Sequence, residues 1–198
     1  MKRLVRAWRT WWHGRKFARK GKHCRFQGRF LLVDGHVEVG DNTRFRENVI
    51  LRTNGEGRII IGNHSMCGFY TIIESSGQVR IGDETAITEF CVIRDTNHVF
   101  YGTDAHWAAT PHITKPVTIG NKVLLGARTY VHPGVTIGDG AIIGVGSVLA
   151  EDTRVGPLEI WAGVPARKLG HRTEGVPEEK LREAQELLAK HGVRKFRY

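Results

Sequence analysis

The stretch that decides the fold is IGNKVLLGARTYVHPGVTIGDGAIIGVGSVLAEDTRVGPLEIW, which runs from Ile119 to Trp161. Every sixth residue of it is apolar, in the order Ile119, Leu125, Val131, Ile137, Ile143, Leu149, Val155 and Trp161. The spacing continues upstream in blocks of three: Val39, Phe45 and Leu51; Ile61, Cys67 and Ile73; Ile81, Ile87 and Ile93. A period of six matches neither the roughly 3.6 residues of a helical turn nor the alternation of a strand. It is typical of a short strand and a tight turn that repeat along the chain.

Gly-Asp or Gly-Asn follows the first residue of most blocks, and these residue types adopt the backbone conformations of tight turns. The pairs are Gly40-Asp41, Gly62-Asn63, Gly82-Asp83, Gly120-Asn121 and Gly138-Asp139, with intervals of 22, 20, 38 and 18 residues between the glycines. Three hexads close one triangular coil, and coils stack at the interstrand distance of about 4.8 Å. The interval of 38 residues exceeds two coils and indicates an excursion over residues 98–116. We therefore predict an all-β solenoid of parallel strands over residues 30–170.

The segments that flank the repeat predict two further elements. Phe30–Val33 and His36–Val39 are separated by Asp34-Gly35 and have the pattern of a lead-in hairpin. Residues 171–198 predict a C-terminal helix and tail, in which Pro177 and two acidic residues begin the helix. Because this helix carries an apolar stripe, we expect it to pack on the end of the solenoid.

The positive charge of the chain is concentrated at its N-terminus. The 198 residues carry a formal charge of +10. Residues 1–29 hold eleven Lys and Arg and no Asp or Glu, whereas residues 30–198 are close to neutral. In a helical projection Trp8, Trp11 and Trp12 lie opposite the basic residues, which favours an arm that binds an anionic membrane surface. Packing of this arm on its own body or on a sister subunit is the alternative. We expect no nucleic acid partner, because the basic signal is confined to one segment.

The chain contains three cysteines, Cys24, Cys67 and Cys91. An odd number of cysteines argues against a disulfide framework. They indicate a reducing compartment, and we expect them to pack as small apolar residues. No run reaches the ~20 apolar residues of a membrane span. We therefore expect a cytoplasmic protein that is peripheral on the inner face of the cytoplasmic membrane if its arm binds lipid.

His98 stands where the regular repeat ends and the excursion begins, and rigid scaffolds carry functional loops at such places. It follows Ile81 by 17 residues, and the repeat closes with Trp161-Ala162-Gly163-Val164-Pro165-Ala166-Arg167-Lys168. Together with the hexads, these motifs resemble the hexapeptide-repeat acyltransferases, in the branch of the maltose and galactoside O-acetyltransferases and related polysaccharide O-acetyltransferases. The resemblance covers about two thirds of the chain and implies a left-handed parallel β-helix.

The resemblance implies a site for direct acetyl transfer from acetyl-CoA, with neutral His98 as the general base. Oxyanion donors would be the backbone at Gly126 and Ala127 or the side chain of Asn97, while Asp95 or Glu89 would orient the imidazole. The residues implied in acetyl-CoA binding are Gly126, Ala127, Val145, Ala162, Gly163, Pro165, Arg167 and Lys168. The resemblance also implies a homotrimer whose neighbouring subunits share each active site.

The acceptor implied by the resemblance is a sugar hydroxyl, of a surface polysaccharide or a lipid-linked glycan. Gly68 and Ser76 stand where the galactoside enzymes have sugar-contacting Asn and Asp, so a simple galactoside is not expected. We expect the acceptor to contact Tyr70, Glu74, Tyr101 and Trp107 instead. The sequence also departs from the family at Val123-Leu124-Leu125-Gly126, where the family often has Val-Trp-Ile-Gly.

Three alternatives remain on the same fold. An amino sugar would make the protein an N-acetyltransferase, and a chain without catalysis would be a β-helix scaffold. A β-helix carbonic anhydrase needs convergent histidines, typically with a pair five residues apart, and no two histidines here have that spacing. We therefore expect no metal site.

Overall fold

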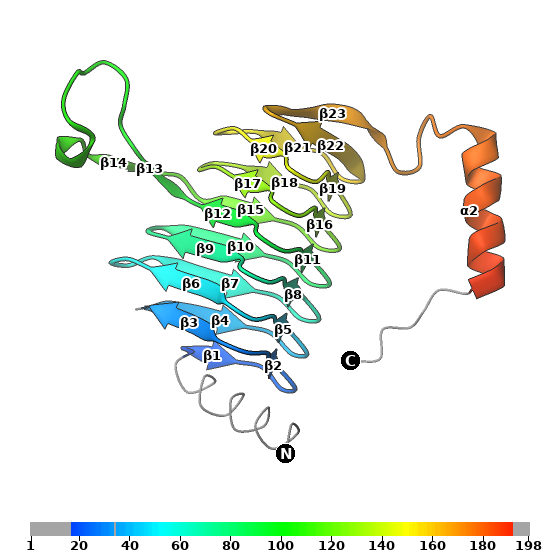
Figure 1. The fold of residues 1–198 in the computed structure, drawn as a ribbon, viewed down its shortest axis with the longest axis horizontal. Helices are drawn as coiled ribbons and strands as arrows, with labels where there is room; N and C mark the ends of the chain where they lie inside the picture. The colour runs from blue at the N-terminus through cyan, green and yellow to red at the C-terminus, as the bar shows by residue number, and fades with distance from the viewer. Residues whose placement is uncertain (1–16, 34, 192–198) are drawn as a thin grey trace.

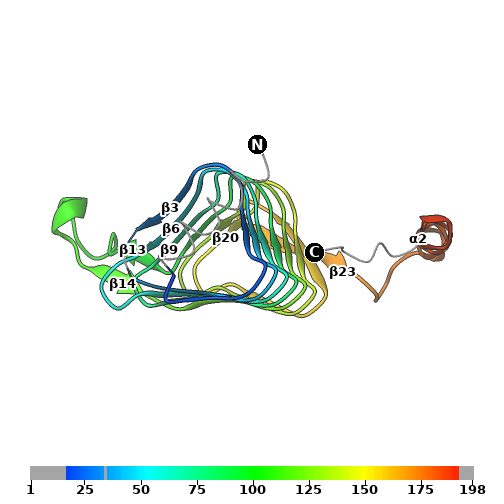
Figure 2. The same cartoon turned by 90° about the horizontal axis from the view of Figure 1, so that it is seen from below.

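The computed structural model describes residues 17–33 and 35–191. In these residues the chain winds through seven coils, and three sheets form the walls of a triangular solenoid (Figures 1 and 2). Sheet A contains β1 (Arg19–Lys20), β4 (His36–Val39), β7 (Arg58–Ile61), β10 (Gln78–Ile81), β15 (Val117–Ile119), β18 (Thr136–Ile137) and β21 (Arg154–Val155). Sheet B contains β2 (Arg25–Phe26), β5 (Arg44–Phe45), β8 (Met66–Cys67), β11 (Ala86–Ile87), β16 (Leu124–Leu125), β19 (Ile142–Ile143), β22 (Glu159–Gly163) and β23 (Ala166–His171). Sheet C contains β3 (Phe30–Val33), β6 (Val49–Thr53), β9 (Ile72–Ser75), β12 (Val92–Arg94), β17 (Tyr130–Val131) and β20 (Val148–Leu149).

The six-residue period places one inward side chain on each wall of a coil. Ile81, Ile87 and Ile93 belong to sheets A, B and C of one coil and are each at most 1% exposed. Ile81 pairs in register with Ile61 below and Ile119 above, so equal residues stack through the core. Burial of each such side chain stabilises the solenoid by about 1.5–3 kcal/mol. The predicted solenoid of parallel strands is confirmed.

The three corners of the solenoid are named here by the sheets that they join: corner 1 joins A to B, corner 2 joins B to C, and corner 3 joins C to A. At corner 1, Asp and Asn alternate from coil to coil in the order Asp41, Asn63, Asp83, Asn121 and Asp139. Each of the first four donates its backbone N–H to the side-chain Oδ1 of the next, at 2.7–2.8 Å. Gly62 must lack a side chain here, because a Cβ would lie 2.6 Å from the Gly82 carbonyl carbon. Alternation keeps carboxylates from stacking directly on one another.

Replacing the amide at this ladder by a carboxylate is expected to destabilise the fold at neutral pH. Hydrogen bonds from the backbone and then the side chain of Asn121 lower the pKa of Asp139. Asn121→Asp removes the side-chain donor and places three carboxylates in a row, so the carboxylates repel one another and the pKa of Asp139 is no longer lowered by that amide. We expect the free energy of unfolding to fall by about 1 kcal/mol at pH 7. The deficit should shrink as pH falls through about 4, where the carboxyl groups protonate in both states. Urea unfolding of the variant and the wild type at pH 7 and pH 3 measures the difference in their free energies of unfolding. An equal difference at both pH values would contradict the prediction.

The solenoid begins earlier than the sequence predicted. Residues 1–29 were expected to form a separate arm, but β1 pairs with β4 and β2 pairs with β5, so residues 17–29 belong to the first coil. The buried rings of Phe17, Phe26, Phe30 and Phe45 pack together at this end with centroids 5.0–6.1 Å apart. The basic residues of the coil face outward. The helix predicted for the arm lies in residues 1–16, outside the described part.

Two other local predictions were wrong. Phe30–Val33 and His36–Val39 are not a hairpin, because β3 pairs with β6 in sheet C and β4 pairs with β1 and β7 in sheet A. The C-terminal helix exists as α2 (Glu178–His191), but it stands away from the solenoid (Figures 1 and 2). Its Leu181, Leu187 and Leu188 are 41–53% exposed. No helix of the described residues is long and apolar enough to cross a membrane.

The three cysteines pack as predicted. All are free and buried. Cys24 and Cys91 hold positions that several other coils fill with Thr or Ser, and their Sγ atoms lie 3.2 Å and 3.3 Å from the carbonyl oxygens of Gly40 and Gly126. Burial raises the pKa of Cys67 to about 12, so this thiol is no nucleophile at neutral pH.

Candidate functional site

The predicted excursion leaves the solenoid at corner 3 of the fourth coil. Its root is a two-stranded antiparallel sheet of β13 (Thr96–His98) and β14 (His112–Thr114), and η1 (Trp107–Ala109) lies near its tip. Figures 1 and 2 show this hairpin projecting from the solenoid wall. Lys115 N–H donates to the Asp95 carbonyl at 2.8 Å, which closes the base of the hairpin. A rigid ladder therefore supports the segment that carries His98.

His98 is half-buried between residues of its own hairpin. His112 is its direct cross-strand partner, with ring centroids 4.1 Å apart, and the Trp107 ring meets it edge-on at 5.5 Å. The hydroxyl of buried Thr110 lies 3.5 Å from Nδ1 of His98 and donates to the Trp107 carbonyl at 2.8 Å. Since that hydroxyl has one hydrogen, it faces His98 as an acceptor. This contact suits the tautomer of His98 that carries its proton on Nδ1 and its lone pair on Nε2. Sequence reasoning missed Thr110 and His112, because the hairpin pairing brings them to His98.

Asn97 ties the hairpin to the rest of the solenoid. Its Oδ1 accepts from the backbone N–H of His98 at 3.0 Å, and its Nδ2 donates to Oε1 of Glu151 at 3.3 Å. Glu151 belongs to corner 3 two coils further on and also lies 3.6 Å from Nζ of Lys115. The side chain predicted to hold an oxyanion is thus engaged in fixing the backbone of His98. Glu151 was missed, since 54 residues separate it from Asn97.

The hydrogen bond between Asn97 and Glu151 predicts a positioning role for Glu151. Glu151→Ala removes the acceptor of Asn97, so the backbone of His98 loses a restraint, and the acetyl transfer expected from the sequence should slow by about tenfold. Glu151→Gln keeps an acceptor oxygen and should retain most of the rate. The measurement is kcat for thiol release from acetyl-CoA, with Asp152→Asn as the control that alters only the Lys115 ion pair. Equal loss in the alanine and glutamine variants would show that charge, not the tether, matters.

Within one chain, neither carboxylate predicted to orient His98 lies beside it. Asp95 is fully buried and turns into the corner, where it accepts from Oγ of Ser75, N–H of Ser76 and N–H of Gly77 at 2.7–2.9 Å. Glu89 is exposed at corner 2, and strand β12 separates it from corner 3 of the same chain. Asp95 is therefore a structural residue of corner 3, and Glu89 lies at the opposite edge of sheet C.

Five of the residues predicted to bind acetyl-CoA stack at corner 2 in successive coils. Gly126 and Ala127 lie below Val145, which lies below Ala162 and Gly163. A Cβ on Gly126 would lie 2.7 Å from the Val145 nitrogen, so the coils approach closely here. Among the backbone hydrogen bonds of the described residues, Gly126 N–H donates to Ile143, but neither Ala127 nor Val145 is a donor. Corner 2 therefore presents a line of available N–H groups beside the exposed Val145.

The closing segment forms an antiparallel pair of β22 and β23, with Pro165 in the exposed turn between them and Ala162 opposite Arg167. Glu159 holds this pair together: it accepts from Nζ of Lys168 at 2.6 Å, Nε1 of Trp161 at 2.8 Å and N–H of Gly156 at 2.7 Å. These donors, Lys168 first, lower the pKa of Glu159 to about 2. Lys168 is thus engaged with a carboxylate, whereas the exposed Arg167 donates to the carbonyl of Ala166. Of Arg167 and Lys168, both predicted to bind acetyl-CoA, Arg167 is the one without an ion pair in the described residues.

The predicted acceptor residues lie in different places. Trp107 is 66% exposed beside His98, and Tyr101 is 62% exposed near the tip of the excursion. Glu74 lies on the outer face of sheet C between Arg52 and Arg94, at 3.3 Å and 3.0 Å, which neutralises it. Tyr70 lies at corner 2 and stacks on Phe90. Of these four residues, Trp107 lies beside His98 in the same chain, and Tyr70 lies at the corner that carries Ala127 and Val145.

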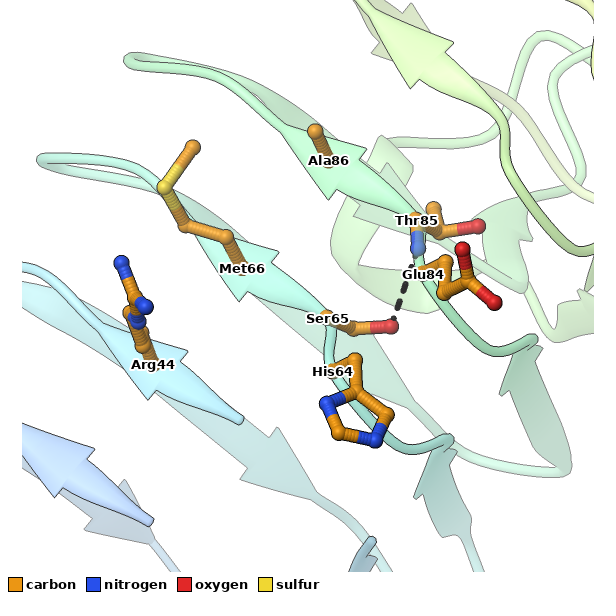
Figure 3. Close-up of a pocket in the computed structure, with 7 residues that line it drawn as sticks. All are labelled: Arg44, His64, Ser65, Met66, Glu84, Thr85 and Ala86. Carbon is orange, nitrogen blue, oxygen red and sulfur yellow. Dashed lines mark hydrogen bonds between the residues drawn. The ribbon is translucent and has the colours of Figure 1, made fainter. Parts of the chain in front are cut away.

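A pocket of about 170 Å³ lies elsewhere, on the outer face of sheet B (Figure 3). Ala86 sits between the longer Met66 and Leu124 in register, which leaves the hollow. The Ser65 hydroxyl in it is used by the fold, since its Oγ accepts from the N–H of Thr85 and donates to the Gly82 carbonyl. In the described part of the chain, His, Cys, Asp and Glu form no group of three or more that could hold a metal ion.

Comparison with known proteins agrees with the fold and the motifs. The family described as bacterial transferase hexapeptide (six repeats) matches residues 116–151. The chain is 34% identical over 140 residues to galactoside O-acetyltransferase of Escherichia coli, in a match that covers 69% of this chain and 64% of that protein. It is 32% identical over 159 residues to a putative lipopolysaccharide biosynthesis O-acetyl transferase, WbbJ, of Escherichia coli. This match covers 73% of this chain and 78% of that protein.

A similar solved structure is AntD, an N-acyltransferase from Bacillus cereus in complex with dTDP and 3-hydroxybutyryl-CoA. It matches with a TM-score of 0.72 and 21% identity over 93% of this chain and 97% of that one, which shows a shared fold. The parallel solenoid, its hexads and the two Escherichia coli relatives together place this chain in the hexapeptide-repeat acyltransferase family.

Proposed function

We propose that the protein is an acetyl-CoA-dependent O-acetyltransferase that acts on a sugar hydroxyl of a surface polysaccharide or lipid-linked glycan. The observation that carries this proposal is the pairing of two features. His98 lies half-buried on a supported hairpin with the Thr110 hydroxyl 3.5 Å from its Nδ1, and at corner 2 the N–H groups of Ala127 and Val145 donate no hydrogen bond within the described residues. The names of the relatives support the reaction class, since both are O-acetyl transferases.

We further propose that the complete site forms between subunits of a homotrimer. Corners 2 and 3 lie at opposite edges of sheet C, so the two halves of the site do not meet in one chain. The outer face of sheet C carries an apolar column in register: Leu31, Ile50, Ile72, Val92, Tyr130 and Val148. The corresponding column of sheet A contains Glu38, Arg80 and Arg154. If sheet C faces a threefold axis parallel to the solenoid, corner 3 of one chain meets corner 2 of the next.

In the proposed mechanism His98 is the general base. Its neutral Nε2 takes the proton of the acceptor hydroxyl while that oxygen attacks the thioester carbonyl carbon. The N–H of Ala127 from the adjoining chain donates to the oxyanion of the tetrahedral intermediate. When the carbon–sulfur bond breaks, the His98 imidazolium returns its proton to the departing thiolate. Thr110 keeps Nδ1 protonated throughout, and no acyl group becomes attached to the protein.

Subunit mixing tests this proposal. His98→Ala removes the base, and Ala127→Pro removes one N–H at a turn position that proline suits, as Pro133 and Pro157 show at other corners of this chain. Each variant alone should be inactive with acetyl-CoA and a glycan panel. A refolded equal mixture should recover about a quarter of the wild-type rate, because a site needs one intact residue from each of two chains. No recovery in mixed trimers contradicts the shared site, and amine acetylation in the same panel would favour the N-acetyltransferase alternative.

The basic N-terminal segment is proposed to bring the enzyme to an anionic membrane surface. Residues 17–29 contribute to the core, so the informative deletion removes residues 1–16 and leaves the first coil intact. We expect the full chain to float with vesicles containing phosphatidylglycerol and the shortened chain to float several-fold less, because each basic residue contributes about 1 kcal/mol near such a surface. Equal flotation of both proteins would contradict membrane binding by this segment.

A further inference from the structure

The hollow on the outer face of sheet B has an apolar lining that the proposed reaction does not use. Its volume is about 170 Å³, and Met66 and Ala86 supply the apolar surface (Figure 3). The hydroxyls of Ser65 and Thr85 beside it both donate to backbone carbonyls, at 2.9 Å and 2.8 Å. A cavity of about 150 Å³ is large enough to hold a benzene molecule. The hollow therefore suits an aromatic ring that carries no polar atom.

Charged groups border the hollow on two sides. At corner 1 lie the exposed carboxylates of Asp83 and Glu84, and within the described residues neither of them forms an ion pair. On the side of the earlier coils, Arg44 lies beside Met66 in register. A guanidinium packs favourably on the face of an aromatic ring. These surroundings favour an occupant that combines an aromatic ring with basic groups directed toward corner 1.

The chain itself contains a segment of this chemistry. Residues 192–198, named here the post-helix segment, follow α2 and lie outside the described residues; they hold three basic residues and no acidic residue around Phe196. α2 lies outside sheet B and runs back from the last coil toward the earlier ones (Figures 1 and 2). The chain from His191, where α2 ends, to Phe196 can span up to about 16 Å. The path of α2 thus carries this segment toward the face that holds the hollow.

We propose that the post-helix segment docks on sheet B of its own chain, with the ring of Phe196 in the hollow at Ala86. Lys195 and Arg197, on either side of that ring, pair with the carboxylates at corner 1. Tyr198 fits less well, because a buried hydroxyl needs a hydrogen-bond partner and both hydroxyls beside the hollow are engaged. An isolated helix of 14 residues is marginal in water, so anchoring the segment that follows α2 also stabilises this helix.

Disulfide trapping on the full chain tests the position of Phe196. We expect Ala86→Cys combined with Phe196→Cys to form a disulfide within one chain when oxidised glutathione is added, seen as a shifted monomer band in non-reducing electrophoresis. The three native cysteines are buried and should not compete. Arg80→Cys combined with Phe196→Cys is the matched control, because Arg80 lies exposed on sheet A of the same coil, and it should cross-link at least tenfold less. A disulfide between two chains would assign the hollow to a second copy and overturn docking within the chain.

Trypsin cleavage after Lys195 measures the docking without added thiols. Ala86→Leu fills the hollow from outside the core, so the segment should be released and cleaved at least fivefold faster. Glu84→Gln should have a smaller effect in the same direction, which high salt removes in wild type as well. Thr118→Leu makes a similar substitution on the outer face of sheet A and should be cleaved at the wild-type rate. Equal cleavage rates in wild type and Ala86→Leu would overturn the proposal.

Discussion

His98→Ala is expected to slow acetyl transfer by about a thousandfold while leaving acetyl-CoA binding unchanged. The imidazole removes a proton from a hydroxyl that is not acidic at neutral pH, and loss of a positioned general base typically costs 10²–10⁴-fold. The donor is proposed to bind at corner 2, which lies across sheet C from His98 in the same chain. The measurement is kcat by thiol release, together with the dissociation constant of acetyl-CoA by calorimetry.

His112→Ala is the matched control for this prediction. It removes the cross-strand neighbour whose ring lies 4.1 Å from that of His98, but it leaves the base and the Thr110 contact in place. We expect the rate to fall by less than about tenfold, as for a packing contact of a functional group. Comparable losses in both variants would mean that the hairpin, and not the His98 imidazole, limits the reaction.

Asp95→Ala is expected to cause the largest loss of stability. The buried carboxylate accepts three hydrogen bonds, from the Ser75 hydroxyl and the N–H groups of Ser76 and Gly77. Each buried donor left without a partner costs about 1–3 kcal/mol, so the free energy of unfolding should fall by roughly 3 kcal/mol or more. Guanidinium unfolding followed by circular dichroism measures the change.

Two comparisons separate this structural role from the catalytic role first predicted for Asp95. Asp104→Ala, at an exposed position of the excursion, should leave stability unchanged. Asp95→Asn keeps one acceptor oxygen and should have intermediate stability. If Asp95→Ala were as stable as wild type but inactive, the carboxylate would act on His98 after all.

The hexads predicted the solenoid because each wall of a coil repeats the same local rule, with one side chain inward and a turn to follow. The rule failed at the first coil, where phenylalanines replace the aliphatic residues and the outward positions are basic. The basic charge of residues 17–29 therefore led to the prediction of a separate arm, although Phe26 is fully buried in the first coil. The strand–turn–strand pattern at residues 30–39 is the same for a hairpin and for a solenoid corner, and only pairing with β6 and β7 distinguishes them.

The site was predictable where it depends on position along the chain and not where it depends on contacts across coils. His98 marks the end of the regular repeat, and that interval is visible in the sequence. Glu151 meets Asn97 across 54 residues, and Thr110 reaches His98 only because β13 and β14 pair. The apolar stripe of α2 likewise predicts a helix but does not name the surface that would cover it.

The alternation at corner 1 limits how such a solenoid can change in length. Removing one inner coil from the series Asp41, Asn63, Asp83, Asn121 and Asp139 would bring two like side chains into contact, either two carboxylates or two amides. Duplicating one coil would do the same, whereas adding or removing two adjacent coils keeps every carboxylate beside an amide. An engineered lengthening by two adjacent coils should therefore keep the stability that duplication of one Asp coil loses, because stacked carboxylates repel each other whereas stacked amides can still exchange hydrogen bonds.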